Sequence, residues 1–367
     1  MSRSGGRAVP EGQVSDPDIG TTAMSGRRRV ISVLVRAVLL VAAVVVVVVF
    51  RHRIAEWWTE LVGVSWRWVL AAALVQLVSM QCLVLLLRVL LRAGGGDASL
   101  AGLTSTIYAG NTISATLPVA GAAASGAYTF RRLHALGNST ALVGWVLAVS
   151  GIAATATLAL VLAVGAAVTG SLLGALGAFL ATVAGVVPVA GIVLVLRHAR
   201  TRALVVRLVS RAARVLGRWV PALRAAHVGR RIDDLFASLG SFRLRPAAAG
   251  AAGLLALANW TLDAGCLALA LQAVGAPVPW QGLLLAWAAG ALASSARLTP
   301  GGIGVVETAL ASALVAAGLP ASQAVPAVLV YRLVNLWLLA GIGALVLMAS
   351  PGAPRRRSGG NDGARPA

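Results

Sequence analysis

The sequence predicts an all-α integral membrane protein with about six full transmembrane helices and two re-entrant helical hairpins. Its 367 residues are 59% hydrophobic and only 11% charged, whereas soluble domains average about 25% charged residues. Apolar runs long enough to cross the hydrocarbon of a bilayer, about 20 residues each, recur along the chain. Two stretches rich in Pro, Gly and Ala interrupt this apolar sequence. Transport proteins often break their membrane helices at stretches of this kind.

Both ends of the chain differ in composition from its middle. Residues 1–29 are rich in Gly, Ser, Asp and Arg and are expected to form a disordered cytoplasmic tail. Residues 30–349 form a single membrane domain, and residues 350–367 form a second disordered, basic cytoplasmic tail. The net charge is +20. Because the arginines flank apolar runs, we attribute them to membrane orientation and expect no binding of nucleic acid.

The expected full spans are residues 31–50, 69–91, 141–168, 172–196, 247–274 and 325–348. No small-residue cleavage motif follows the first span, which is therefore interpreted as a signal anchor. Residues 197–245 form a basic cytoplasmic loop in which Arg207, Arg211, Arg214 and Arg218 recur at helical spacing. This loop is either an amphipathic helix on an anionic leaflet or a solvated segment that only sets orientation.

The two hairpins are expected at residues 99–132 and 283–319. The first has a polar arm and a small-residue arm on either side of Pro118. The second breaks at residues 297–302, where Pro300 lacks a backbone donor and Gly301 and Gly302 disfavour a helix. Each arm is short for a full crossing. The alternative is that the arms are short full spans packed through small residues, which gives eight or more spans.

Arginine asymmetry places both termini and the 197–245 loop on the cytoplasmic side of a bacterial plasma membrane. With that orientation, the first two spans, first hairpin and third span run in the opposite sense to the remaining spans and hairpin. This arrangement predicts an inverted repeat, which many transporters use to build a site at the middle of the bilayer.

Four ionisable residues are expected at membrane depth, where a charge costs a few kcal/mol and needs a partner or water: Asp263, Arg297, Glu307 and Arg332. They could line a polar cavity in which arginines bind a lipid phosphate and a carboxylate binds a cationic headgroup or a proton. Alternatively, they form structural pairs such as Asp263–Arg332 or Glu307–Arg297. The candidate substrate-binding residues are Glu307, Arg332, Arg297, Asp263, Pro300, Gly301, Gly302, Pro118, Arg131 and Tyr331.

Motifs of enzymes and metal sites are absent from the sequence. The histidines are scattered without the spacing of metal ligands, and both cysteines fall inside expected spans. No phosphate-binding glycine loop and no nucleophile elbow occur. We therefore expect a protein that is not an enzyme and that holds no cofactor or metal.

Several stretches resemble one family. The pattern from Pro300 to Gly304 followed by Glu307 is similar to the PGG-[LIV]-G-x-x-E signature of the lysylphosphatidylglycerol synthase transmembrane-region family. The Leu117-Pro118 turn with Gly126, Tyr128, Arg131 and Arg132 resembles the first signature stretch of that family, in its actinobacterial form. Further similarities are Asn259, Trp260 and Asp263; Tyr331, Arg332 and Trp337; and Arg297 before the PGG. Together they cover about residues 30–348.

The resemblance implies a lipid-moving membrane domain. In bifunctional members, this domain flips an aminoacylated phospholipid that a soluble C-terminal transferase makes. Since this sequence ends at Ala367, we expect a stand-alone member without the transferase. The expected function is a flippase for a polar-headed lipid, anionic, aminoacylated or glycosylated. The alternative is a non-transporting scaffold for a separately encoded lipid synthase or glycosyltransferase, and a membrane-embedded transferase is least favoured.

Overall fold

The computed structural model describes residues 63–170, 244–296 and 299–349, which are helices and connecting turns without any strand. The chain divides into two units, residues 1–54 and residues 55–367, and every described residue belongs to the second. The expected spans at 31–50 and 172–196, both tails, nearly all of the basic loop and Arg297 lie outside the described residues.

Four described helices are long and apolar enough to cross a membrane. They are α2 (Trp66–Ala93), α5 (Thr140–Thr169), α9 (Pro246–Ala273) and a continuous run from 321 to 349. The last comprises α12 (Ala321–Arg332), the π-helical segment η4 (Leu333–Leu338) and α13 (Leu339–Ala349). The bounds of these helices match those predicted for the spans at 69–91, 141–168, 247–274 and 325–348 to within four residues at each end.

Shorter helices occur where the two interruptions are expected. The first pair is α3 (Leu100–Thr116) and α4 (Gly121–Ala135), separated by residues 117–120. The second pair is α10 (Trp280–Ser295) and α11 (Val305–Ala316), separated by a break that contains the 3-10 turn η3 (Pro300–Gly302). The two helices of each pair pack against each other. Whether these pairs are re-entrant stays a prediction.

Small residues allow the arms of each pair to approach closely. A Cβ atom added at Gly110 of α3 would lie 3.1 Å from Ser125 Oγ of α4, and one at Gly290 of α10 would lie 2.6 Å from Leu310 of α11. Close packing through glycine is a common way to associate helices in lipid, where no hydrophobic effect drives them together.

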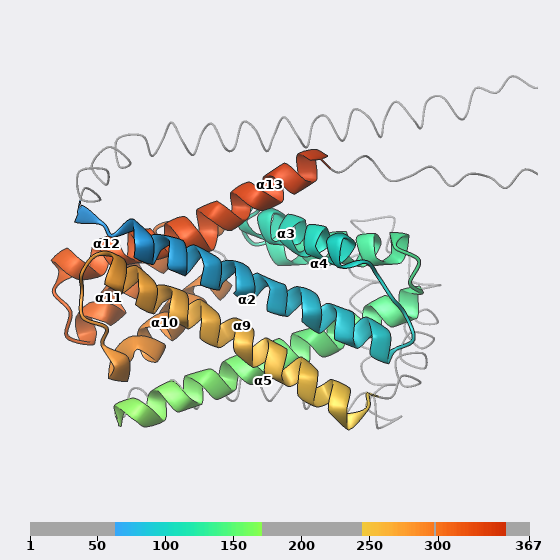
Figure 1. The fold of residues 1–367 in the computed structure, drawn as a ribbon, viewed down its shortest axis with the longest axis horizontal. Helices are drawn as coiled ribbons and strands as arrows, with labels where there is room; N and C mark the ends of the chain where they lie inside the picture. Colours follow the sequence, from blue (N-terminus) through green and yellow to red (C-terminus); the bar gives the residue numbers. More distant parts are fainter. Residues whose placement is uncertain (1–62, 171–243, 297–298, 350–367) are drawn as a thin grey trace, which may run out of the picture. The chain divides into compact units, whose positions relative to one another are not determined.

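The centre of the described unit is the pair α2 and α9, which lie side by side along most of their length (Figure 1). Ser79 in α2 donates to the backbone and side-chain oxygens of Asn259 in α9, at 2.9 and 3.1 Å. Both helices end in the same cap. Gly95 and Gly275 have φ of +83° and +70°, and the next N–H bonds back to Leu91 and Leu271 respectively, which is the Schellman pattern.

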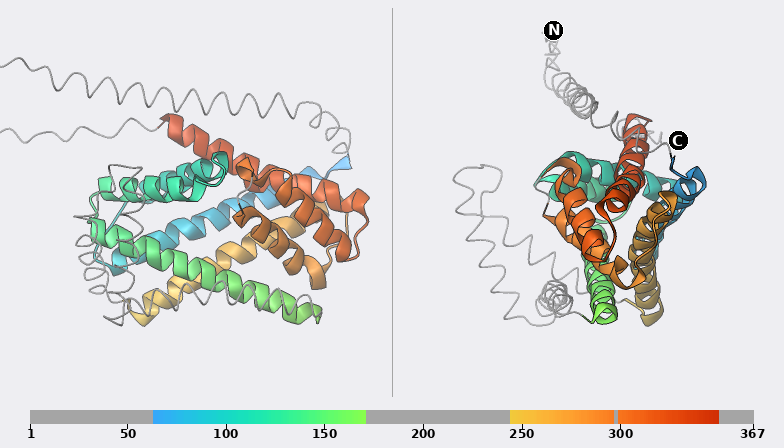
Figure 2. Two further views of the ribbon diagram at one scale, coloured as in Figure 1. Left: turned by 180° about the vertical axis from the view of Figure 1, so that it is seen from behind. Right: turned by 90° about the vertical axis from the view of Figure 1, so that its left-hand side faces the viewer.

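The remaining helices pack around α2 and α9, and one helix of each short pair lies against a helix from the other half of the chain. From the first short pair, α3 lies against α13, and Thr112 donates to Ala340 O at 3.1 Å. From the second, α10 lies against α5. The helix α5 also crosses α9 (Figure 2), where Trp260 Nε1 donates to Ala154 O at 2.9 Å. The breaks of the two short pairs are thereby held within one bundle.

Candidate functional site

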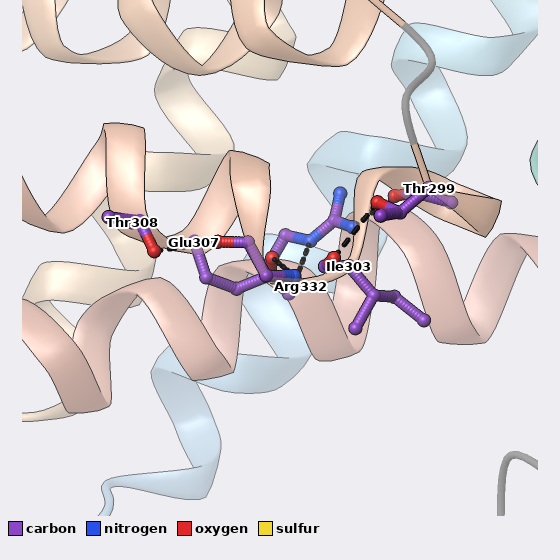
Figure 3. Close-up of polar contacts among 7 residues, drawn as sticks. Thr299, Ile303, Glu307, Thr308 and Arg332 are labelled. Atoms are coloured by element: carbon purple, nitrogen blue, oxygen red, sulfur yellow. Dashed lines mark hydrogen bonds and ion pairs between the residues drawn. The ribbon is translucent and has the colours of Figure 1, made fainter.

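The second break is a tight turn that glycine makes possible. Gly301, Gly302 and Gly304 have φ of +62°, +69° and +86°, values that side-chain-bearing residues rarely adopt. Thr299 Oγ1 donates to Ile303 O at 2.9 Å, and Gly302 N–H donates to Thr299 O at 3.0 Å (Figure 3). The turn therefore satisfies part of its own backbone and presents other polar groups to its surroundings.

Glu307 joins this turn to the last full span. Its Oε2 accepts from the N–H of Gly304, the residue that caps α11, at 2.7 Å. Its Oε1 accepts from Arg332 Nε, also at 2.7 Å (Figure 3). Arg332 Nη2 donates to Gly301 O. The guanidinium, only 6% exposed, thus binds the carboxylate and the broken backbone at once, as its planar fork allows.

A cavity of about 140 Å³ lies where the two breaks meet. That volume accommodates several water-sized groups. Its lining combines the end of the first short helix, the second break and the last span: Asn111, Ser114, Ala115, Leu117, Ser294, Thr299, Gly301, Gly302, Arg332, Asn335 and Leu336. Most of these residues offer hydroxyl, amide, guanidinium or bare backbone groups, so the cavity is suited to a small polar ligand.

Asp263 of α9 is bound by neutral donors next to this cavity. Its Oδ2 accepts from Trp287 Nε1 at 2.9 Å and from the hydroxyl of Tyr331 at 3.1 Å. Its Oδ1 accepts from Asn335 Nδ2 at 2.5 Å. The donors come from α10, α12 and η4. Since Asn335 also lines the cavity, the carboxylate and the cavity share one side chain.

Comparison with known protein families identifies the family of this chain. The sequence profile of the lysylphosphatidylglycerol synthase transmembrane region matches residues 33–343 of the 367. The chain belongs to the lysylphosphatidylglycerol synthase transmembrane-region family. No curated protein matches it. The family match confirms the resemblance drawn from the PGG signature and, together with the apolar helices, establishes a multi-pass membrane protein.

One of the two ion pairs expected from the sequence, Asp263–Arg332, does not form. Arg332 pairs with Glu307 and not with Asp263. The reason is helical geometry. Tyr331 and Asn335 are four residues apart and share one face, which is turned to α9. Arg332 is rotated by about 100° from Tyr331 and meets the second break. The other suggested pair, Glu307–Arg297, involves a residue outside the described ranges.

The remaining candidate residues are placed as follows. Gly301 and Gly302 line the cavity, while Pro300 begins the 3-10 turn beside it. Pro118 is exposed and follows Leu117, which does line the cavity. Arg131 is exposed in the last turns of α4, where its Nε donates to Ala127 O at 3.3 Å. It is not among the residues that line the cavity.

Several polar residues of the site are absent from the candidates drawn from the sequence. Asn111, Ser114, Ser294, Thr299 and Asn335 line the cavity. Trp287 donates to Asp263, and Gln76 lies close enough to interact with that carboxylate. A signal existed for some of them, since Asn111 and Ser114 belong to an arm too polar to face lipid, and Gln76 is an amide inside an apolar span.

Gly304 provides a test of the turn. Its φ of +86° and ψ of −45° suit only glycine, yet a Cβ added there meets no atom within 4 Å. We therefore expect Gly304→Ala to lower the free energy of unfolding by about 1–3 kcal/mol through backbone strain alone. Thermal unfolding in detergent measures this. The control is Gly265→Ala, an open position inside α9. If both variants lower the free energy of unfolding equally, backbone strain at Gly304 is not the cause.

Proposed function

We propose that this protein moves a polar-headed lipid between leaflets, with the headgroup passing through the cavity between the two breaks. The observation that carries the proposal is the cavity itself, since both helix breaks and Arg332 contribute to its lining. In a bilayer, broken backbone persists only where protein or a water-filled cavity satisfies it. Discontinuous helices that meet in this way form the substrate sites of many transporters.

The chemistry of the lining favours a headgroup that is anionic, aminoacylated or glycosylated. Arg332 donates from Nε and Nη2 to groups of the protein. An incoming phosphate would compete with Glu307 for the guanidinium, because both accept charge-assisted hydrogen bonds from the same fork. A Glu307 released in this way could pair with an ammonium group, while the hydroxyls and amides of Asn111, Ser114 and Ser294 suit sugar or glycerol hydroxyls.

The helix packing supports an inverted repeat around this site. Ser79 and Asn259, which bond to each other, are 180 residues apart. The same spacing relates Gly95 to Gly275 in identical caps and Gly110 to Gly290 between paired arms. In such a repeat, α3 is equivalent to α10, and α5 is equivalent to α13. The contacts of α3 with α13 and of α10 with α5 are then equivalent contacts between the two halves. We place both termini on the cytoplasmic side of a bacterial plasma membrane, as arginine asymmetry indicates.

Lipid exchange in reconstituted vesicles tests the proposal. Purified protein is placed in vesicles of phosphatidylethanolamine and phosphatidylglycerol that contain a trace of fluorescent phosphatidylglycerol, and the accessible probe is quenched from outside. We expect wild type to exchange the probe faster than empty vesicles. Glu307→Gln and Arg332→Ala should slow exchange about tenfold or more, because each removes a charge-assisted hydrogen bond at the cavity.

The matched control is Arg92→Ala. Arg92 forms an ion pair with Asp97 at 3.4 Å, and both side chains are more than half exposed. Its loss should leave exchange unchanged, since exposed pairs contribute little. Wild-type vesicles that exchange no faster than empty ones refute transport of this probe and favour the alternative, a non-transporting partner of a separate lipid synthase or glycosyltransferase.

A further inference from the structure

Asp263 is a partly buried carboxylate that no described cation balances. It lies well inside α9, a helix apolar enough to cross a membrane. Within the described ranges, the ion pairs are Arg92–Asp97 and Arg332–Glu307. Carboxylates inside a bilayer normally pair with a cation, coordinate an ion or bind a proton. The groups around Asp263 decide among these roles.

The partners of Asp263 are hydrogen-bond donors and not metal ligands. Trp287 and Tyr331 donate to Oδ2, and Asn335 donates to Oδ1. An indole N–H cannot coordinate a cation, and an amide binds one through its oxygen, which here points the other way. Across the described ranges no group of three potential metal ligands occurs. The surroundings therefore suit exchange between a carboxylate and a carboxylic acid.

Gln76 supplies the feature that a protonated Asp263 needs. It lies in α2, is 3% exposed and is close enough to Asp263 for its amide to interact with the carboxylate. Its Oε1 is buried without a hydrogen-bond partner. A half-turn of the amide exchanges its oxygen and its NH₂. Gln76 can therefore donate to the ionised carboxylate, or accept the O–H of the protonated acid and satisfy the orphaned oxygen.

Asn335 connects this exchange to the cavity. Its amide donates to Asp263 Oδ1 and also lines the cavity beside Arg332. An anionic headgroup that takes the hydrogen bond of Asn335 would leave Asp263 with one donor fewer. A carboxylate that loses a donor in a low-dielectric site is less stable relative to its protonated form. Proton uptake would also offset the negative charge that the headgroup brings.

We propose that Asp263 binds one proton when an anionic headgroup occupies the cavity, so that lipid and proton cross the membrane together. This inference rests on the proposed function. The proton comes from water, bonds to a carboxylate oxygen of Asp263 and is donated to Gln76 Oε1. On release of the headgroup, Asn335 returns to Oδ1 and the proton leaves to water.

Among the residues that the structure describes, few other ionisable groups lie near Asp263. From α12, Tyr331 donates its hydroxyl to the carboxylate, and the neighbouring Arg332 is bound to Glu307 and Gly301. On α9 itself, Cys266 lies close enough to interact electrostatically with Asp263. The parts of α2, α5 and α10 packed on this region of α9 contribute no ionisable side chain, only the amide of Gln76 and the indole of Trp287. Cys266 is therefore the ionisable neighbour on α9 that the control variant removes.

A steady-state vesicle experiment tests the coupling. Vesicles of phosphatidylethanolamine and phosphatidylglycerol with fluorescent phosphatidylglycerol are given a pH difference of one unit across the membrane. One proton per lipid permits accumulation of up to about tenfold in the leaflet that faces the alkaline side. We expect this accumulation with wild type and Cys266→Ala, and a leaflet ratio near one with Asp263→Asn.

Infrared spectroscopy of purified protein provides a measurement independent of transport. Short-chain phosphatidylglycerol should increase the carbonyl band of a protonated carboxyl group in wild type. The band should be absent in Asp263→Asn, and it should shift in Gln76→Met, which keeps the carboxyl and removes its acceptor. A band that persists in Asp263→Asn, or a band that Gln76→Met does not shift, overturns the assignment.

The outcomes separate the two proposals. Wild-type exchange that is faster than empty vesicles but shows no leaflet accumulation overturns proton coupling and leaves the proposed function intact. Wild-type vesicles that exchange no faster than empty ones overturn the proposed function and the coupling that rests on it.

Discussion

Replacing Arg332 with alanine should lower the free energy of unfolding by about 3 kcal/mol, the lower end of the 3–5 kcal/mol range for broken buried ion pairs. The lower end applies because the Glu307 side chain keeps 23% exposure while that of Arg332 is 6% exposed. The substitution leaves Glu307 without its cation and Gly301 O without its donor. Thermal and denaturant unfolding of purified protein in detergent measure the loss.

The controls separate charge from geometry. Arg332→Lys keeps the charge but cannot bind Glu307 Oε1 and Gly301 O with one planar group, so we expect it to recover only part of the stability. Glu307→Gln keeps an acceptor for the Gly304 N–H. Combined with Arg332→Met, it should cost less than the sum of the two single variants, because neither charge is then left alone. Strict additivity contradicts a coupled pair.

The full spans could be predicted from the sequence because apolar length is a direct physical requirement. A helix needs about 20 apolar residues to cross hydrocarbon, and the described spans begin and end within four residues of the predicted bounds. The breaks could be predicted for a related reason. Pro300 and the glycines after it have conformational preferences that act locally, and the observed φ values of Gly301, Gly302 and Gly304 depend on them.

The partners inside the site could not be predicted in the same way. Which residue faces which depends on how helices rotate against each other, and hydropathy does not report rotation in a helix that is apolar on all sides. Tyr331 and Arg332 are adjacent in sequence yet bind different carboxylates, on α9 and on α11. Trp287 gave no signal, since a tryptophan in an apolar helix fits lipid contact equally well.

The position of the break at residues 117–120 could be predicted from the sequence, but its backbone geometry could not. Pro118 predicted a turn, but Val119 adopts φ of +54°, which is uncommon for a residue branched at Cβ. The turn also brings Gly121 so close to Ser114 that a Cβ there would lie 2.4 Å from Ser114 O. The approach of the two arms, which no local preference encodes, therefore determines this geometry.

Replacing Gly343 with alanine should destabilise the protein by about 3 kcal/mol or more, at or above the upper end of the usual cost of overpacking. Gly343 lies in α13 where it crosses α3. A Cβ there would lie 2.1 Å from Thr112 Oγ1 and 2.3 Å from the backbone oxygen of Tyr108. A backbone oxygen cannot rotate away, so the two helices must separate and break the Thr112–Ala340 hydrogen bond.

Gly341→Ala is the matched control, because Gly341 lies in the same helix and a Cβ there meets no atom within 4 Å. Alanine is favoured over glycine inside a helix by about 0.5–1 kcal/mol, so this variant should unfold at the same temperature as wild type or higher. Because α3 also carries Asn111 and Ser114 into the cavity, Gly343→Ala should slow lipid exchange while Gly341→Ala does not. Equal stability of the two variants would show that α3 and α13 are not in contact as described.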